Sequence, residues 1–212
     1  MLEYERSFWK TSPAMVLAGI DEAGRGPLAG PVFASAVSID EAAIESLASG
    51  PLAGLTDSKK LTAAKREHFH EVLLSLPEVR TSVAFSTAAE IDSINILKAT
   101  HLAMRRAAEG LVPPPAHVLV DGLPVKNLPC PSTPIVKGDA KSLLIAAASV
   151  MAKVERDHLM LELDAKYPGY GFAIHKGYGT AAHLDALRRL GPCPEHRRTF
   201  RPVSDLFYSL FP

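Results

Sequence analysis

The chain has 212 residues, of which 47% are hydrophobic and 22% charged, and its formal net charge is zero. This is ordinary globular composition, sufficient for one domain with a sizeable core, and it provides no overall basic charge that would by itself indicate a polyanion partner. No apolar run is long enough to span a membrane, the N-terminus lacks the apolar core of a signal peptide, and the two cysteines match no zinc-binding spacing, so we expect a reduced cytosolic protein.

The first half of the chain predicts strands before helices. After a lead-in of 13 residues, apolar runs predict a strand over residues 14–20 and a hairpin partner over 30–39. A polar connection rich in small residues then leads to a helix over 62–76, which Pro77 ends, and to an alternating strand over 79–85.

The second half alternates strands and helices. Thr87 and Glu90 form a capping box, which predicts a helix over 88–110. The remaining predicted elements are short strands at 117–120 and 135–136, a long helix over 142–167, a loop over 170–178 rich in aromatic and cationic residues, and a helix from Thr180 to Gly191. The first half of the long helix, residues 143–152, is small and apolar, which lets a helix lie close against a sheet.

This order predicts an α/β fold with a mixed β-sheet flanked by helices. We expect residues 1–167 to form the catalytic domain. Residues 168–212 would then form a small C-terminal helical extension that contributes substrate contacts.

The stretch GIDEAGRGPLAG, residues 19–30, places two adjacent acids, Asp21 and Glu22, at the end of an apolar run. Acids at the end of a buried strand repel each other unless a cation neutralises them. The following Gly24, Arg25 and Gly26 can let a ligand approach the main chain closely. The alternative is a solvated turn with ordinary turn chemistry. A dinucleotide-binding loop is disfavoured, because the glycine spacing differs and no helical pattern follows.

Two further acids, Asp121 and Asp139, also follow predicted strands and lie next to glycine. Carboxylates delivered by separate strands suit Mg²⁺ or Mn²⁺, and such clusters often hold two ions during phosphate hydrolysis. Each acid also has a simpler interpretation: Asp139 as the N-cap of the next helix and Asp121 as a turn residue. Asp157 lies inside a helix, where pairing with a lysine or arginine is the expected role.

At this point the sequence resembles a known family, the type 2 ribonucleases H, and specifically bacterial ribonuclease HII. The resemblance is carried by segments spread over nearly the whole chain, namely GIDEAGRGPLAGPV (19–32), LTDSKKL (55–61), IDSINIL (91–97), VLVDG (118–122), VKGDAKSLLIAAASVMAKVERDHLM (136–160), YGFAIHKGYGTAAHLDAL (170–187) and HRRTFRPV (196–203).

The resemblance implies a ribonuclease H-like fold and an endonuclease that hydrolyses the RNA strand of RNA–DNA hybrids. It also implies incision 5′ of ribonucleotides embedded in duplex DNA, leaving 5′-phosphate and 3′-hydroxyl ends by two-metal-ion catalysis. By motif position, the catalytic and metal-binding carboxylates are Asp21, Glu22, Asp121 and Asp139.

The resemblance also implies how the substrate is read. Residues 24–26 correspond to the loop that senses the ribose 2′-hydroxyl, and Tyr178 to the tyrosine that stacks on the deoxyribose beyond the RNA–DNA junction. From their charge and position, the candidate phosphate contacts are Lys59, Lys60, Lys176, Arg197 and Arg198, each of which could instead be a solvated surface charge. Lys153 and Arg156 could orient the acids from their helix. His175, His183 and His196 are not spaced as metal ligands.

Two alternative functions stay open. The first is a non-catalytic nucleic-acid-binding module, and the second is a metal-dependent nuclease with a different substrate preference, such as a ribonuclease HIII-like enzyme. The sister type HIII typically has lysine where Arg25 stands, which favours HII. We expect a monomer without membrane contact, and the aromatic tail around Phe207, Tyr208 and Phe211 could bind a sliding clamp or pack on its own domain.

Overall fold

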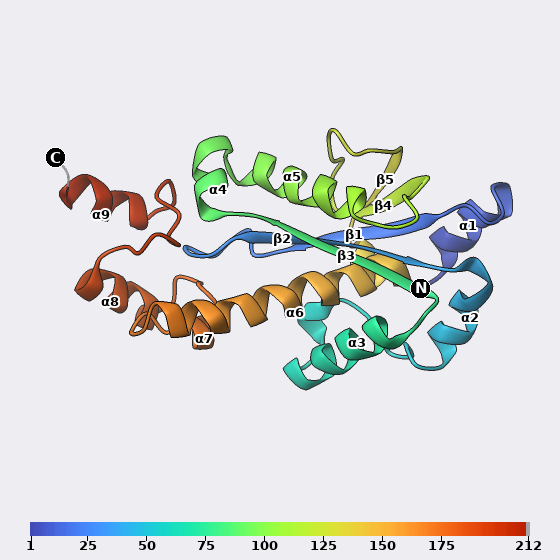
Figure 1. Cartoon of the computed structure of the whole chain (residues 1–212), viewed down its shortest axis with the longest axis horizontal. Coiled ribbons are helices and arrows are strands. Elements are labelled where there is room, and N and C mark those ends of the chain that lie inside the picture. Colours follow the sequence, from blue (N-terminus) through green and yellow to red (C-terminus); the bar gives the residue numbers. More distant parts are fainter. Residues whose placement is uncertain (211–212) are drawn as a thin grey trace.

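A computed structural model describes residues 1–210, with side chains described as far as residue 206. A mixed sheet lies between two layers of helices (Figure 1), as the sequence predicts. Among the described residues no helix is long and apolar enough to cross a membrane. The elements are α1 (Glu3–Thr11), β1 (Leu17–Ala23), β2 (Val32–Ile39), α2 (Glu41–Ser49), α3 (Ala63–Ser75), β3 (Val79–Ser86), α4 (Ala88–Ile94), α5 (Ile96–Glu109), β4 (His117–Asp121), β5 (Ser132–Ile135), α6 (Leu143–Lys166), α7 (Phe172–His175), α8 (Ala181–Leu190) and α9 (Val203–Leu210).

The sheet has five strands in the order β3-β2-β1-β4-β5. β1 and β2 form the expected antiparallel hairpin, and β3 pairs antiparallel with β2. β4 runs parallel to β1, with Ile20 opposite Val120, and β5 runs parallel to β4. This register brings Asp21 and Asp121, the next residue of each strand, side by side at the same end of the sheet.

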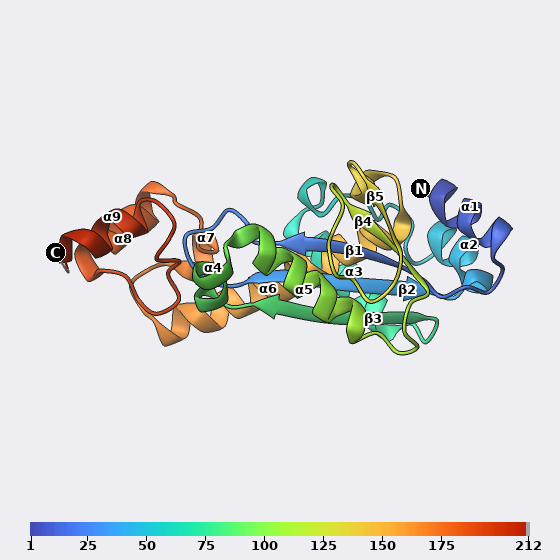
Figure 2. The ribbon, with the colours of Figure 1, turned by 90° about the horizontal axis from the view of Figure 1, so that it is seen from above.

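Helices cover both faces of the sheet. α6 and α3 lie on one face, and α4 and α5 on the other (Figure 1). The larger apolar core lies between α6 and the sheet, and a second core of small side chains lies beneath α5. Seen from above, α7, α8 and α9 lie beyond one end of the sheet, and α1 and α2 beyond the other (Figure 2).

The contact between α6 and β1 is unusually close. An added Cβ at Gly19 would collide with the main chain of Leu144 and Ile145, so a glycine is required there. The facing part of α6 is small and apolar, with Ala146, Ala147 and Ala148 fully buried. The prediction that this helix lies close against the sheet is confirmed, because small side chains on both elements let the backbones approach.

Several sequence predictions of secondary structure were wrong. The lead-in forms α1, and the connection after β2 contains α2. The helix predicted over residues 88–110 is two helices, because Asn95 takes a positive φ of 70° and its side chain caps α5 by accepting from Lys98 N. Asparagine is enriched among the few residues other than glycine that take a positive φ. The predicted strand at 135–136 begins earlier, at Ser132.

α1 is attached to the core through a buried acid. The Glu5 carboxylate is fully buried and accepts hydrogen bonds from Ser142 Oγ at 2.7 Å and Leu144 N at 3.2 Å. Burial raises the pKa of Glu5, and the hydrogen bonds oppose this only in part. An acid in a lead-in segment offers no sequence signal for such a position, since its partners lie more than 130 residues away.

We expect Gly19→Ala to destabilise the protein by about 1–3 kcal/mol or more, because the methyl group must displace the α6 backbone rather than a flexible side chain. Urea unfolding followed by circular dichroism measures this. An unfolding midpoint equal to that of the wild type would contradict the close contact.

Glu5 predicts a specific pH dependence of stability. Since its folded-state pKa is raised, the folded protein binds more protons than the unfolded chain between the ordinary glutamate pKa and the raised one, so its contribution to stability falls as pH rises through that window. Glu5→Gln removes this titration. Relative to the wild type, Glu5→Gln should therefore become more stable as the pH rises from 4 to 8. A difference in unfolding free energy between the two proteins that stays constant over this range would refute the prediction.

Candidate active site

Three carboxylates from three separate segments meet at one end of the sheet. Oxygen atoms of Asp21, Asp121 and Asp139 all lie within 4.8 Å of one another. Asp21 lies in β1, Asp121 ends β4, and Asp139 lies in a 3-10 turn after β5. The convergence that the sequence suggested is therefore present in the fold.

Main-chain donors hold two of these acids in place. Gly138 N donates to Asp121 Oδ1 at 2.6 Å, and Glu22 N donates to Asp21 Oδ1 at 2.7 Å. The alternative role of Asp139 as the N-cap of α6 is wrong, because Ser142 performs it by accepting from Ile145 N. Asp139 is buried, and its carboxylate belongs to the acidic cluster instead.

The cluster is electrostatically unfavourable as it stands. Burial, followed by the charges of Glu22 and Asp121, raises the pKa of Asp21 well above its usual range. Burial, followed by the charge of Asp121, raises the pKa of Asp139. Buried acids that repel each other are stabilised when a cation binds between them, so this donor set fits a divalent ion with oxygen ligands.

Glu22 lies beside the cluster of three rather than within it. The side chains of successive strand residues face opposite sides of a sheet, so those of Asp21 and Glu22 point to opposite faces. Arg25 Nη1 lies 3.5 Å from Glu22 Oε1. Burial raises the pKa of Glu22, Arg25 opposes this, and the charge of Asp121 adds to it, which shows that Glu22 and Asp121 are electrostatic neighbours.

Lys59 contributes positive charge near the same place. Partial burial works to lower the pKa of Lys59, but the charges of Asp21, Asp57, Asp139 and Asp121 together raise it. Its segment forms a short 3-10 helix that Asp57 caps by accepting from Lys59 N at 2.9 Å. Lys59 is thus an electrostatic neighbour of the acids.

The glycine-flanked arginine and Tyr178 meet at one cavity. This cavity has a volume of about 220 Å³ and is lined by Glu22, Ala23, Gly24, Arg25, Gly26, Ser58, Lys59, Ser149, Lys153, Arg156 and Tyr178. An added Cβ at Gly26 would lie 3.7 Å from the Tyr178 ring, so ring and loop are in close proximity. Tyr178 is 46% exposed, which leaves its ring open to a ligand.

Arg197 and Lys176, which the sequence suggested as phosphate contacts, differ in how deeply they are buried. Arg197 is fully buried and donates to the carbonyl oxygens of Gly24, Arg25 and Gly30, so the prediction of a phosphate contact is wrong for Arg197. Lys176 takes a left-handed conformation and its ammonium lies 3.4 Å from the Asp157 carbonyl oxygen. Unlike Arg197, Lys176 is only half-buried.

Several other polar residues of α6 and the extension that the sequence singled out have structural partners. Asp157 pairs with Lys153 at 2.5 Å, as expected for an acid inside a helix. Arg156 bonds to loop carbonyls rather than to the acids.

The three histidines His175, His183 and His196 are buried, and His183 Nε2 lies 3.1 Å from His196 Nε2. Burial, followed by the charge of His183, lowers the pKa of His196 to about 4, so His196 is neutral at pH 7.

Sequence reasoning missed a pair of serines. Ser149 Oγ lies 2.8 Å from Ser58 Oγ, and the Ser149 side chain works to lower the pKa of Asp21, so the serine pair adjoins the acidic cluster. The pair links α6, the segment carrying Lys59 and the acidic cluster. The available signal was Ser149 itself, the one polar residue within the otherwise apolar run 143–152.

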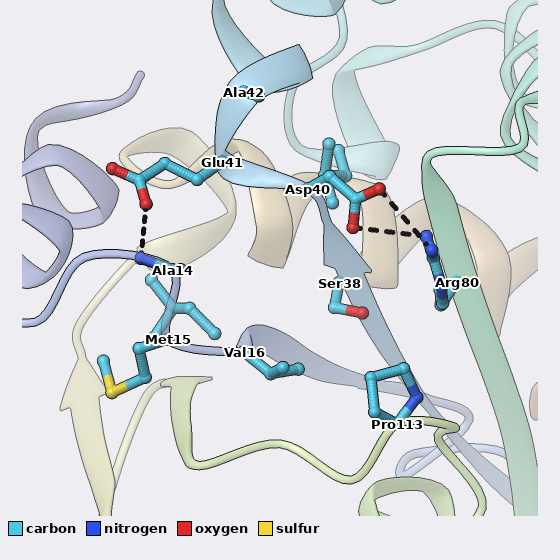
Figure 3. A pocket seen from close by; sticks show the side chains of 11 residues that line it. Ala14, Met15, Val16, Ser38, Asp40, Glu41, Ala42, Arg80 and Pro113 are labelled. Atoms are coloured by element: carbon cyan, nitrogen blue, oxygen red, sulfur yellow. Dashed lines mark hydrogen bonds and ion pairs between the residues drawn. The ribbon is translucent and has the colours of Figure 1, made fainter.

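A larger cavity, of about 610 Å³, lies elsewhere, between the start of β1 and the end of β2, with Met15, Val16 and Pro113 among its lining residues (Figure 3). Its charged groups are already paired: Arg80 with Asp40 at 3.4 Å, and the Glu41 carboxylate with Ala14 N at 2.7 Å (Figure 3). It therefore lacks the converging unpaired acids found at the other end of the sheet.

The tail suggested as a clamp-binding segment falls largely outside the described side chains. The backbone of α9 is described to Leu210, but the side chains of Phe207 and Tyr208 are not, and Phe211 lies outside the described residues.

Comparison with known proteins identifies the family. The family model described as Ribonuclease HII matches residues 18–203. A ribonuclease HII of Verminephrobacter eiseniae is 52% identical over 91% of this chain and 88% of its own length. A ribonuclease HII of Geobacter metallireducens is 48% identical over 95% of this chain and 93% of its own length.

Solved structures agree with this assignment. The ribonuclease H2 of Pyrococcus horikoshii superposes with a TM-score of 0.76 at 28% identity, covering 92% of this chain and 98% of that one. The ribonuclease HII in a complex with PCNA from Archaeoglobus fulgidus gives a TM-score of 0.67 at 27% identity, covering 82% and 88%. From the matched family model and these relatives, the chain belongs to the ribonuclease HII family.

Proposed function

We propose that Asp21, Glu22, Asp121 and Asp139 form the catalytic site with which this ribonuclease HII family enzyme hydrolyses the RNA strand of RNA–DNA hybrids. We further propose that it incises 5′ of single ribonucleotides embedded in duplex DNA, leaving 5′-phosphate and 3′-hydroxyl ends. The observation that carries the site assignment is the convergence of three carboxylates within 4.8 Å from segments far apart in sequence.

The donor set suits Mg²⁺ or Mn²⁺, since all its ligand atoms are carboxylate oxygens. Bound divalent ions supply an activated water and stabilise the charge on the leaving 3′-oxygen. The chain supplies the geometry. Gly138 N and Glu22 N orient Asp121 and Asp21. Lys59 adds positive charge where the scissile phosphate would lie, next to the acids.

Recognition of the sugar would use residues 24–26 and Tyr178, which line the 220 Å³ cavity. The 2′-hydroxyl is the feature that distinguishes RNA from DNA. The backbone of residues 24–26 can hydrogen-bond it, and the neighbouring Tyr178 ring can stack on the next sugar when that sugar lacks a 2′-hydroxyl. Together they would select an RNA-to-DNA junction.

Residues 168–212 are proposed to act as an extension of the catalytic domain that carries Tyr178. α8 and α9 lie beyond the end of the sheet on which the Gly-Arg-Gly loop is located (Figure 1). A sliding clamp stays a predicted partner of the C-terminal tail, supported by the similarity to the archaeal protein solved with PCNA. A monomer in the cytoplasm likewise stays a prediction.

Metal binding predicts a difference in thermal stabilisation. Mg²⁺ should raise the melting temperature of the wild type more than that of Asp121→Asn, because ligand binding stabilises only a protein whose site is intact. Differential scanning fluorimetry with and without Mg²⁺ measures the shifts. Asp40→Asn makes the same chemical change at the other end of the sheet and should keep the full shift. Equal shifts for wild type and Asp121→Asn would contradict the assignment.

The proposed activity is tested with a labelled DNA duplex that carries one ribonucleotide. We expect a single nick on the 5′ side of the ribonucleotide with Mg²⁺ and none with EDTA. An all-DNA duplex should stay intact, and Asp121→Asn should lower the rate by at least about 10³-fold, because the missing carboxylate removes charge and orientation from the reacting groups.

The other outcomes distinguish the rival functions. Cleavage of a continuous hybrid without nicking at a single ribonucleotide would indicate a ribonuclease HIII-like preference. Metal-independent binding without cleavage of either substrate would indicate a nucleic-acid-binding module.

A further inference from the structure

Two buried arginines lie directly beneath the Gly-Arg-Gly loop (residues 24–26). Arg197 and Arg156 are 0% and 1% exposed. Arg197 donates from Nη2 to Gly24 O at 2.5 Å, from Nη1 to Arg25 O at 2.8 Å, and from Nε to Gly30 O at 3.0 Å. A guanidinium has its donors in a fixed planar fork, so three carbonyls held by one such group are fixed relative to each other.

The direction of these carbonyls determines where the loop's amides point. The two peptide bonds that join Gly24, Arg25 and Gly26 are trans, and a trans peptide is planar with its N–H opposite its C=O. Because the carbonyls of Gly24 and Arg25 point inward to Arg197, the N–H groups of Arg25 and Gly26 point the other way. Arg197 thereby turns two main-chain donors toward the cavity that residues 24–26 line.

Arg156 joins the segment that follows this loop to the segment that carries Tyr178. It donates from Nε to Pro31 O at 3.2 Å and from Nη2 to Ala29 O at 3.3 Å. The same Nη2 donates to Lys176 O at 3.0 Å, two residues before Tyr178. One buried side chain therefore holds both walls of the sugar-binding cavity at a defined separation.

The segment that carries Arg197 is itself fixed at both ends. On one side, Arg197 N donates to Leu28 O at 2.8 Å, which pairs the segment with the loop. On the other side, the Asp92 carboxylate accepts from Arg198 N and Thr199 N, both at 2.9 Å, and from Thr199 Oγ1 at 2.7 Å. Asp92 lies in α4, so it ties the C-terminal segment to the catalytic domain.

Burying a guanidinium is costly even though Arg197 also lies 5.0 Å from the centre of the Phe200 ring, because none of its hydrogen bonds goes to a carboxylate. Burial, followed by the charge of Arg156, lowers the pKa of Arg197 to about 9, so Arg197 remains charged at pH 7. An apolar side chain would fill the same volume without this cost. The presence of a buried arginine here is explained if its role is to orient the carbonyl groups of the loop.

We propose that Arg197 is a positioning residue for ribose recognition, which orients the Arg25 and Gly26 amides toward the 2′-hydroxyl, and that Asp92 holds Arg197 in register. This inference rests on the proposed reading of the 2′-hydroxyl by residues 24–26. It gives separate roles to the segments 91–97 and 196–203, which lie outside the acidic cluster.

The test measures binding rather than cleavage. In the Asp121→Asn background, where the duplex stays intact, fluorescence anisotropy gives the affinity for a duplex with one ribonucleotide and for the all-DNA duplex of the same sequence. Arg197→Lys keeps the charge but loses the planar fork. It should lower the preference for the ribonucleotide by about tenfold, the equivalent of one lost hydrogen bond, while leaving all-DNA affinity unchanged. Arg201→Lys makes the same exchange at an exposed arginine and should keep the preference.

Asp92→Ala provides a second variant in case Arg197→Lys does not fold. It should lower the preference in the same direction, whereas Asp185→Ala, which removes an exposed aspartate of α8 paired with Arg189, should not. An unchanged preference, or equal weakening of both duplexes, would overturn the inference and leave the proposed function standing. No preference in the Asp121→Asn parent would instead overturn the reading of the 2′-hydroxyl by the loop, and this inference with it.

Discussion

The close contact between α6 and β1 at Gly19 is the constraint on which the rest of the structure depends. Since no Cβ separates the two backbones there, the helix and the central strand behave as one rigid unit. The unit fixes Ser149 of α6 next to Asp21 of β1, two residues beyond Gly19. It also fixes where α6 begins, and hence where the turn that carries Asp139 must lie. The acidic cluster is a consequence of how closely a helix can approach a strand.

A cluster of buried acids lowers the stability of the fold that carries it. Burial and mutual repulsion raise the pKa values of Asp21 and Asp139, which means that the charged forms are destabilised without a cation. Main-chain donors offset part of this cost at two of the acids, Glu22 N at Asp21 and Gly138 N at Asp121. The repulsion is then available to favour binding of divalent ions.

Reading a sugar requires a different kind of rigidity, that of a loop. Glycines permit the backbone to approach a ligand, but they also leave the loop free to adopt many conformations. The buried Arg197 and Arg156 remove that freedom by holding loop carbonyls from beneath. The acidic cluster and the braced loop thus follow the same principle, because in both the backbone geometry is determined before any ligand binds.

The sequence by itself determined the family, through its resemblance to ribonuclease HII, and the α/β class, through the order of its apolar runs. It also singled out four candidate acids, because acids next to glycine at the ends of apolar runs are a local pattern. It also predicted the small apolar face of α6 and the pairing of Asp157 with a nearby cation. It could not predict α1, whose Glu5 is satisfied by Ser142 and Leu144 far along the chain, or the break at Asn95. It suggested a phosphate contact for Arg197, whose charge is a sequence property but whose burial is not. Only the tertiary structure decided that Arg197 faces inward and that Asp21, Asp121 and Asp139 share one site, because burial and convergence arise from contacts between residues distant in sequence.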